Sequence, residues 1–323
     1  MILLIVLSVV FMFSVLMTGF IRKYALSRSI IDIPNERSSH TSPTPRGGGA
    51  AIVILLLISV LYCYFSNLFS LETFCALGIG TFTVAIAGWV DDHKHIHALV
   101  RAIVYALAAT WAIVWLNIEY NFYSELFTFP YGLICCVFIV IGIVWLTNLF
   151  NFMDGTDALA AIQSICASTA VSFLFWVEGQ QGMMLVSSVM LASCCGFLYW
   201  NWPPAKIFMG DVGSCALGFC FAILAVLGEI TDSIPMPIWF ILLSVFICDA
   251  TFTLLLRIIR GEKWYKAHKS HAYQRLVQCG MSHKKLVSFF LSINILVLWP
   301  LACIVYKEKT LTMHVLFFVI LLM

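Results

Sequence analysis

The chain has 323 residues, of which 62% are hydrophobic and 11% charged, and its formal net charge at pH 7 is +2. Soluble domains carry roughly 25% charged residues, so this chain could not cover a soluble surface with polar groups. The composition excludes a soluble globular protein, indicates an integral membrane protein surrounded by a lipid bilayer, and gives no reason to expect a nucleic-acid partner.

The first apolar segment, residues 2–21, has about the length of a bilayer span, roughly twenty residues. No positively charged region precedes it, unlike in a secretory signal peptide, whereas Arg22, Lys23 and Arg28 follow it. We predict a first transmembrane helix with its N-terminus outside the cell.

Further apolar segments of about the length of a span follow along the chain. They are 48–66, 71–90, 98–116, 131–148, 158–177, 182–200, 213–230, 236–256 and 286–306. A last segment, 311–323, is too short for a comfortable span. We therefore predict a single all-α domain over residues 1–323, a polytopic integral membrane helical bundle of 10–11 transmembrane helices. No internal repeat is visible, which argues against an inverted-repeat transporter.

The twelve cysteines lie mostly inside these apolar segments, with no CxxC pair and no Cys/His cluster of zinc spacing. We interpret them as small buried hydrophobic residues. The basic residues set the orientation: with ten spans, 16 of the 18 Lys and Arg fall in loops on one side, and only Lys307 and Lys309 fall on the other. The basic side is predicted to be cytoplasmic.

Four polar clusters fall on this predicted cytoplasmic side. In chain order they are Asp91-Asp92, Asp154 and Asp157 in "NLFNFMDGTDALAA", Asp211 in "PPAKIFMGDVGS", and His268 and His271 in "KAHKSHAYQRL". Each has an ordinary explanation, namely a solvated helix end, helix caps at Asp157 and Asp211, and surface histidines. Taken together, five acids on one face without a local excess of bases favour a cation site.

Carboxylate ligands suit Mg²⁺ or Mn²⁺ better than zinc, and protein-bound Mg²⁺ usually uses one or two carboxylates together with substrate phosphates. The acids therefore predict phosphate chemistry. The same face supplies groups that could hold phosphates: Arg37, His40, Arg46, Lys94, Arg101 and Lys206. Several of them belong to a Pro- and Gly-rich loop, 22–46, which on composition alone is either an ordinary loop or part of this site.

Asp249 differs from the other acids because it lies eight residues before Arg257, well inside an apolar segment. On a straight helix this places it roughly 12 Å from the helix end. A carboxylate inside a membrane segment suggests a functional site by default. The sequence leaves two alternatives open, a group that faces the site and a structural hydrogen-bonding residue.

Five motifs in this order resemble the polyprenyl-phosphate N-acetylhexosamine-1-phosphate transferases, which start peptidoglycan lipid I, O-antigen and teichoic acid synthesis. The motifs are "IDIPNERSSHTSPTPRGGG", "GWVDDHKHI", "NLFNFMDGTDALAA", "FMGDVGS" and "HKSHAYQRL". The resemblance implies an Mg²⁺-dependent enzyme of the bacterial inner membrane with its active site on the cytoplasmic face. The implied substrates are a UDP-N-acetylhexosamine and undecaprenyl phosphate, and UMP leaves. A homodimer is compatible with the sequence, which does not set the oligomeric state.

The resemblance also implies roles for the donor side of the site. Asp211 is implied as the main Mg²⁺ ligand, with help from Asp154. Phe208, three positions before Asp211, is implied to stack on uracil. Asn151, Asp154 and Asp157 are implied to line the nucleotide and metal pocket.

On the acceptor side, the resemblance places Asp91 and Asp92 near the attacking lipid phosphate, one of them as base or nucleophile. His268 and His271 are implied to contact the donor's diphosphate or sugar. We expect the lipid phosphate to attack directly, with Asp91 as base if one is needed, because a phosphate of second pKa about 6 is already mostly ionised at pH 7. A route through an aspartyl-phosphate intermediate stays open.

Three departures from the peptidoglycan branch favour the O-antigen-initiating branch. Ala158 and Ala161 stand where many relatives have Gly, His95 stands where the peptidoglycan enzyme has Lys, and the histidine motif reads His-Lys-Ser-His. A plain or deoxy N-acetylhexosamine is therefore the expected sugar. Two rival classes are a cation transporter or channel, suggested by Asp249, and a membrane-embedded hydrolase using the same metal site.

Overall fold

Helices account for most of the chain in the computed structural model, which describes residues 2–34, 42–94, 96–118, 132–262 and 268–322. The long helices are α1 (Ile2–Ser27), α2 (Ala50–Phe65), α4 (Gly80–Lys94), α5 (Ala98–Trp115), α7 (Gly132–Met153), α8 (Leu159–Val177), α9 (Gln181–Asn201), α10 (Asp211–Ile230) and α12 (Ser244–Ile259). The shorter elements are α3 (Leu71–Thr73), η1 (Phe74–Ile79), α11 (Met236–Leu242), α13 (Ala272–Gln278), α14 (His283–Ile293), η2 (Asn294–Leu298), α15 (Trp299–Lys307), η3 (Lys309–Leu311) and α16 (Thr312–Leu322).

Eight helices in the described residues are long and apolar enough to cross a membrane. The bent pair of α11 and α12 makes a ninth, and α2 and α16 are shorter apolar helices. Each of the eleven apolar segments of the sequence thus has a helical counterpart, which confirms the prediction of a polytopic helical membrane protein.

Helix α10 is the centre of the bundle. It packs mainly against α4 and α7, with α2 and α11 also in contact, and 89% of its span is buried. A helix that is apolar all round is expected to be enclosed by other helices. Its first residue is Asp211, so the packing of the core sets the position of this carboxylate.

Glycines let two neighbouring helices approach the beginning of α10 very closely. A Cβ on Gly49 would lie 2.3 Å from the Gly213 Cα, and a Cβ on Gly88 would lie 2.4 Å from the Asp211 carbonyl oxygen. Small residues at helix crossings permit such backbone contact in membrane proteins. The start of α10 is therefore held between the N-terminal end of α2 and the last two turns of α4.

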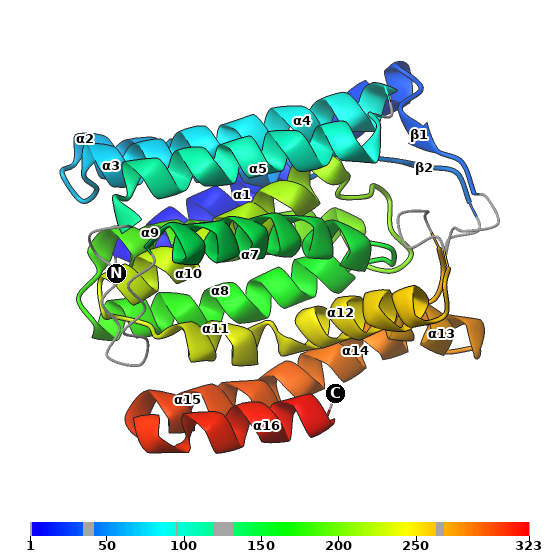
Figure 1. The fold of residues 1–323 in the computed structure, drawn as a ribbon. Coiled ribbons are helices and arrows are strands. Elements are labelled where there is room, and N and C mark those ends of the chain that lie inside the picture. The colour runs from blue at the N-terminus through cyan, green and yellow to red at the C-terminus, as the bar shows by residue number, and fades with distance from the viewer. Residues whose placement is uncertain (1, 35–41, 95, 119–131, 263–267, 323) are drawn as a thin grey trace.

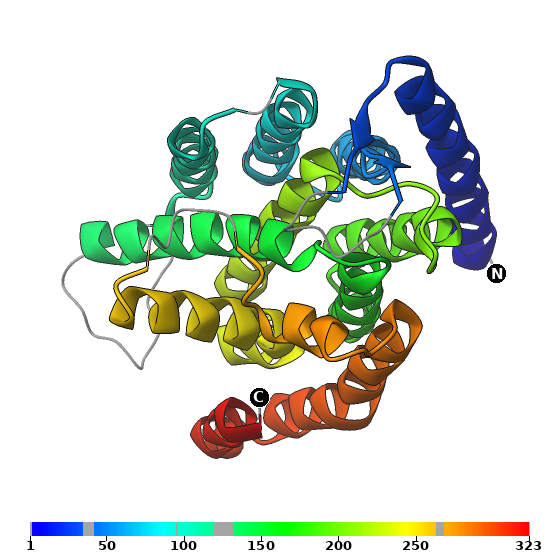
Figure 2. The same ribbon diagram turned by 90° about the vertical axis from the view of Figure 1, so that its right-hand side faces the viewer.

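Loop 22–46 contains a short antiparallel strand pair that the sequence did not predict. Strand β1 (Ile31–Asp32) pairs with β2 (Thr44–Pro45), with Ile31 opposite Pro45. The pair folds the loop back over one end of the bundle (Figures 1 and 2). This places Arg46, the residue after β2, beside the end of α4.

Helices α11 and α12 meet at a bend of 79° beside Leu243. The Leu242 carbonyl accepts a hydrogen bond from Gln163 Nε2 at 2.8 Å, and Gln163 Oε1 accepts one from Asn294 Nδ2 at 3.0 Å. Gln163 and Asn294 are both buried. Backbone carbonyls exposed by a break inside a membrane must find hydrogen-bond partners within the protein. Gln163 is the partner of the Leu242 carbonyl, and Asn294 binds Gln163 in turn.

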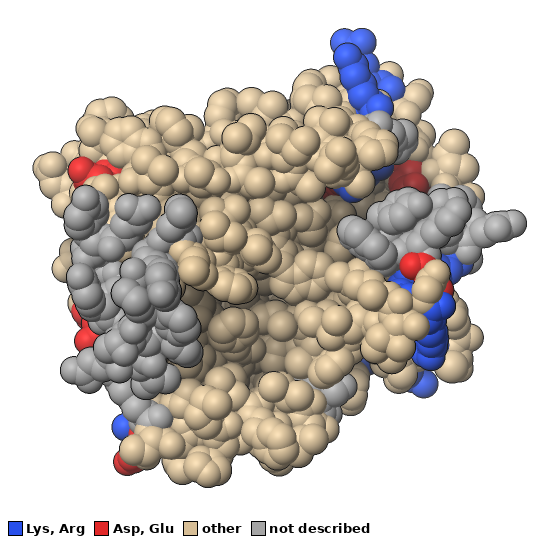
Figure 3. Space-filling model, in the orientation of Figure 1, with Lys and Arg blue, Asp and Glu red and all other residues tan. Residues whose placement is uncertain are grey.

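Charged side chains gather at the two ends of the bundle, and the face between them is almost uncharged (Figure 3). We call the end where α4 and α7 finish and α10 begins the site end; it lies at the right of Figure 1. The N-terminus lies at the opposite end (Figure 1). That this opposite end faces outside the cell stays a prediction.

Candidate active site

Asp92 binds the N-terminus of α10. Its Oδ1 accepts the Asp211 amide at 3.0 Å and its Oδ2 accepts the Val212 amide at 3.2 Å. The first amides of a helix lack partners within the helix, and a carboxylate there both accepts their hydrogen bonds and interacts favourably with the helix dipole. The sequence suggested that Asp211 itself could be a cap, but the cap is supplied from α4, by a residue expected to be catalytic.

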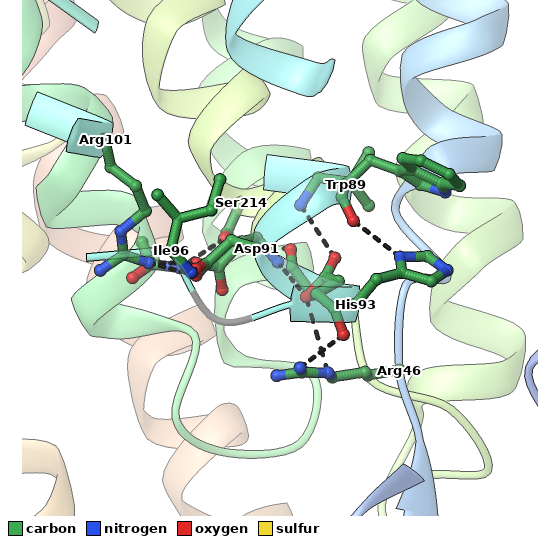
Figure 4. Close-up of polar contacts among 12 residues, drawn as sticks. Arg46, Trp89, Asp91, His93, Ile96, Arg101 and Ser214 are labelled. Carbon is green, nitrogen blue, oxygen red and sulfur yellow. Dashed lines mark hydrogen bonds and ion pairs between the residues drawn. The ribbon is translucent and has the colours of Figure 1, made fainter. Parts of the chain in front are cut away.

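Arg46 supports Asp92 from the loop after β2. Its Nη2 donates to the Asp92 carbonyl oxygen at 2.5 Å, and its Nε lies 3.8 Å from Asp92 Oδ1. Figure 4 shows Arg46 next to the end of α4. Arg46, expected to bind phosphate, is thus engaged with a carboxylate and with the backbone of the capping residue.

Arg101 connects Asp91 with Asp211 (Figure 4). Its Nη1 lies 2.5 Å from Asp91 Oδ2 and 2.5 Å from Asp211 Oδ2. The other Asp91 oxygen accepts the Ile96 amide at 2.5 Å. A guanidinium from α5 therefore lies between the two carboxylates, which come from α4 and α10. The sequence predicted no local excess of bases around these acids; in the structure Arg101 partners Asp91 and Asp211, and Arg46 partners Asp92.

Asp154 has a different environment. It follows the end of α7 and is half-buried, and no described group donates a hydrogen bond to its carboxylate. Burial raises the pKa of Asp154 well above its usual value, and the charges of Asp211, Asp92 and Asp157 raise it further. A cation at this position would offset both effects. On the preceding turn, Asn151 Nδ2 donates to Ser214 Oγ of α10 at 3.2 Å.

The donor set suits Mg²⁺ in kind, because it consists of carboxylate oxygens. Within the described residues no three His, Cys, Asp or Glu side chains gather closely enough to hold a metal by themselves. An Mg²⁺ ion held by one or two of these carboxylates would need a substrate phosphate to complete its ligands. Asp154 and Asp211 fit such a partial site.

Asp157 has partners of its own outside this group of acids. Its Oδ2 accepts the Ala205 amide at 3.1 Å and lies 3.2 Å from His283 Nδ1. The prediction that Asp157 caps the next helix is wrong: the N-cap of α8 is Ala158, without a side-chain cap. Ala158 has φ +63°, a conformation that favours glycine, and its amide donates to Asn201 Oδ1 at 2.8 Å.

A pocket of about 380 Å³ lies beside Asp157. Its lining includes Phe208, Thr44, Ser282, His283 and Lys284. Phe208 is half-buried, and its amide donates to the Pro45 carbonyl at 2.8 Å. The pocket joins the loop before α10, the strand pair and the start of α14. His283 was not predicted as a site residue, and its only signal in the sequence is its place in a basic segment between two apolar ones.

The histidine segment is held by Asp249. Asp249 Oδ1 accepts the Ala272 amide at 2.9 Å and lies 3.2 Å from His271 Nδ1, while its Oδ2 accepts the Tyr273 amide at 3.1 Å. Thr253 Oγ1 adds a fourth hydrogen bond at 3.1 Å. Of the two alternatives for Asp249, the structure supports the hydrogen-bonding residue, and this residue orders the start of α13.

His268 and His271 are adjacent, with ring centroids 4.9 Å apart. Burial, together with the charges of His271 and Arg257, lowers the pKa of His268 to about 4. Tyr273 Oη donates to the Phe152 carbonyl at 2.9 Å, which ties this segment to the end of α7. The histidine segment thus contacts the chain that carries Asp154.

Of the four other predicted phosphate-binding residues, the structure places two, Lys94 and Lys206. Arg37 and His40 lie outside the described residues, and Lys94 is exposed at the end of α4. Lys206 lies on the loop before Phe208, but its ammonium group is placed over aromatic rings at the end of α9.

Comparison with known proteins gives a consistent set of relatives. Residues 74–229 match Glycosyl transferase family 4. The chain is 33% identical to the probable undecaprenyl-phosphate N-acetylglucosaminyl 1-phosphate transferase of Bacillus subtilis, over 88% of this chain and 81% of that protein. It is 28% identical to the decaprenyl-phosphate N-acetylglucosaminephosphotransferase of Mycolicibacterium smegmatis, over 84% of this chain and 74% of that protein. It is 25% identical to the phospho-N-acetylmuramoyl-pentapeptide-transferase of Halalkalibacterium halodurans, over 86% of this chain and 88% of that protein.

Proposed function

The chain belongs to the polyprenyl-phosphate N-acetylhexosamine-1-phosphate transferases of glycosyl transferase family 4, and we propose that it starts the synthesis of a lipid-linked cell-envelope glycan. In the proposed reaction a polyprenyl phosphate oxygen attacks the sugar-linked phosphorus of a UDP-N-acetylhexosamine. A new P–O–P bond forms, the bond to the bridging oxygen of UMP breaks, and UMP leaves. The observation that carries the proposal is the meeting of Asp91 and Asp211 at Arg101, beside the Asp92 carboxylate that caps α10.

Asp211 and Asp154 would hold Mg²⁺, which when bound would neutralise charge on the diphosphate and on the leaving UMP. Most of the remaining work is positioning, since phosphoryl transfer needs little covalent help from a protein. Arg101 lies within ion-pair distance of the carboxylates from both α4 and α10. It can therefore hold a phosphate oxygen at the point where donor and acceptor must meet.

Asp91 is the proposed base, because its contact to Arg101 places it beside Asp211, whereas the Asp92 carboxylate caps α10. A base contributes little if the lipid phosphate is already ionised. A phosphate with a second pKa of about 6 is mostly ionised at pH 7. Phe208 and the adjacent pocket offer an aromatic face and polar walls suited to the nucleoside of the donor.

A plain or deoxy N-acetylhexosamine is the proposed sugar, as expected for the O-antigen-initiating branch. Two observations support it: the His-Lys-Ser-His motif, and the N-acetylglucosamine named for the Bacillus subtilis and Mycolicibacterium smegmatis relatives. The proposed location is the bacterial inner membrane, with the site end in the cytoplasm. The basic residues on that side of the sequence support this orientation.

The test uses purified protein with undecaprenyl phosphate, Mg²⁺ and a panel of UDP-N-acetylhexosamines. Formation of lipid-linked sugar together with equimolar UMP is expected for one or a few donors. Release of UMP without undecaprenyl phosphate would indicate a hydrolase instead, and no UMP from any donor would contradict the transferase. Asp211→Ala should abolish turnover while the protein still inserts into membranes. Glu262→Ala, which removes an exposed carboxylate outside the proposed site, is the matched control.

A further inference from the structure

A cluster of basic and aromatic side chains joins the site-end termini of α1 and α9, outside the proposed active site. Its members are Arg22 from α1, Tyr199 and Trp200 from the last turn of α9, and Lys206 from the loop that follows. We call it the interfacial cluster. We propose that it binds the phosphate headgroup of an anionic membrane phospholipid, and the proposal does not depend on the enzymatic reaction.

Trp200 is the fixed element of the interfacial cluster. Its Nε1 donates to the Val15 carbonyl of α1 at 2.9 Å. A Cβ on Gly19 would lie 3.0 Å from the ring, so the indole lies directly against the α1 backbone. Tyr199 meets Trp200 edge-on, with ring centroids 5.6 Å apart. The rings therefore form a rigid support at the junction of the two helices.

Two cations lie near this support. The Arg22 guanidinium carbon is 5.8 Å from the Trp200 ring centroid, and Lys206 Nζ is 5.6 Å from the same centroid and 5.9 Å from that of Tyr199. These distances lie within the range of cation–π contact, roughly 6 Å. Arg22 Nε also donates to the Lys206 carbonyl at 3.1 Å. The two positive groups are therefore held together by the fold.

No carboxylate balances these charges within the described residues, where every ion pair involves other cations. Two like charges on one aromatic support repel each other unless an anion or water intervenes. A phosphate diester carries the complementary charge and accepts hydrogen bonds from both a guanidinium and an ammonium group. The cluster therefore has the charge and the donors for one phosphate.

The surroundings indicate a lipid rather than a soluble anion. Leu16 and Phe20 lie on the preceding turns of α1 and are 54% and 69% exposed, as expected for side chains that face acyl chains. Tyr199 is 61% exposed at the end of the apolar span. Exposed Tyr and Trp next to basic residues mark the level of the headgroups, where basic residues attract anionic lipids. A lipid bound here would place its tails along α1.

Native mass spectrometry of the detergent-purified protein, titrated with phosphatidylglycerol, measures this binding directly. Arg22→Gln and Lys206→Gln should each weaken the apparent affinity about five-fold. This factor corresponds to the roughly 1 kcal/mol that one basic residue contributes to binding at a membrane surface. The double variant should weaken it about 25-fold if the two effects add. Lys23→Gln removes the same charge one residue away and should leave the affinity nearly unchanged. The Lys23 side chain is exposed, and no described aromatic ring lies in cation–π contact with it.

Four outcomes would overturn the proposal. Lys23→Gln could weaken binding as much as Arg22→Gln, which would mean diffuse attraction without a site. Phosphatidylcholine with the same acyl chains could bind equally well, or inorganic phosphate could displace the lipid at similar concentration. The melting temperature in phosphatidylcholine alone is the control for folding. A lower value for the double variant there would mean that the two cations hold α1 against α9, and this too would contradict a lipid site.

Discussion

Replacing Asp92 with Asn tests whether this carboxylate acts mainly through α10. Asn keeps one acceptor but turns a donor toward the second of the two amides that Asp92 accepts, at 3.0 and 3.2 Å. A hydrogen bond to a charged group contributes about 1.5–3 kcal/mol, and an N-terminal cap about 1 kcal/mol. Water weakens these interactions little, because the Asp92 side chain is 1% exposed. We expect a loss of about 2 kcal/mol, which is roughly 30-fold in an equilibrium constant.

Hydrogen exchange of the first turn of α10 is the direct assay. In Asp92→Asn, the amides of Asp211 and Val212 should exchange roughly 30-fold faster, because local opening costs about 2 kcal/mol less. Asp91→Asn is the matched control, an equal change one residue away that removes a contact to Arg101 but none to these amides. Unchanged exchange in Asp92→Asn, or equal acceleration in Asp91→Asn, would refute the capping role.

Three further predictions concern the surroundings of the site. Asp249→Ala should lower kcat about ten-fold or more by releasing His271, since a buried polar group left unpaired costs about 1–3 kcal/mol; unchanged kcat would contradict this. His268 is neutral in the fold with a pKa of about 4 and protonates near 6.5 when unfolded, so melting temperature should fall between pH 6.5 and 4, and less steeply in His268→Gln. Gly88→Ala should destabilise the protein by about 1–3 kcal/mol through overpacking. Gly142→Ala is the control and should not destabilise the protein, because a Cβ at this position would meet nothing within 4 Å. Equal melting temperatures for the two variants would count against the close helix contact.

The transmembrane helices could be predicted because length and hydropathy determine them locally. The bend beside Leu243 could not, because no proline or glycine occurs in 239–247 and the freed carbonyl is satisfied by Gln163, about 80 residues earlier in the chain. The strand pair in loop 22–46 was missed for a related reason: each strand has two residues, too few to show a period.

The candidate site shows the same limit. Charge counting placed the polar clusters on one face, and the structure brings Asp91, Asp92 and Asp211 together there. Partners were not predictable, because they depend on which helices touch. Arg101, which is still predicted to hold phosphate, bridges two acids that the sequence did not pair with it. Asp157 was expected to cap a helix and instead meets His283. A residue type indicates which contacts are possible, and only the packing decides among them.

The bend between α11 and α12 changes how sequence variants in this protein should be judged. A hydropathy scale scores Gln163→Leu as an improvement, since it makes an apolar helix more apolar. In the folded chain the same change would leave the Leu242 carbonyl without the amide that now binds it and would remove the acceptor of Asn294. A screen for better membrane insertion would therefore favour a substitution that destabilises the folded bundle, and insertion and folding must be measured separately for residues inside these spans.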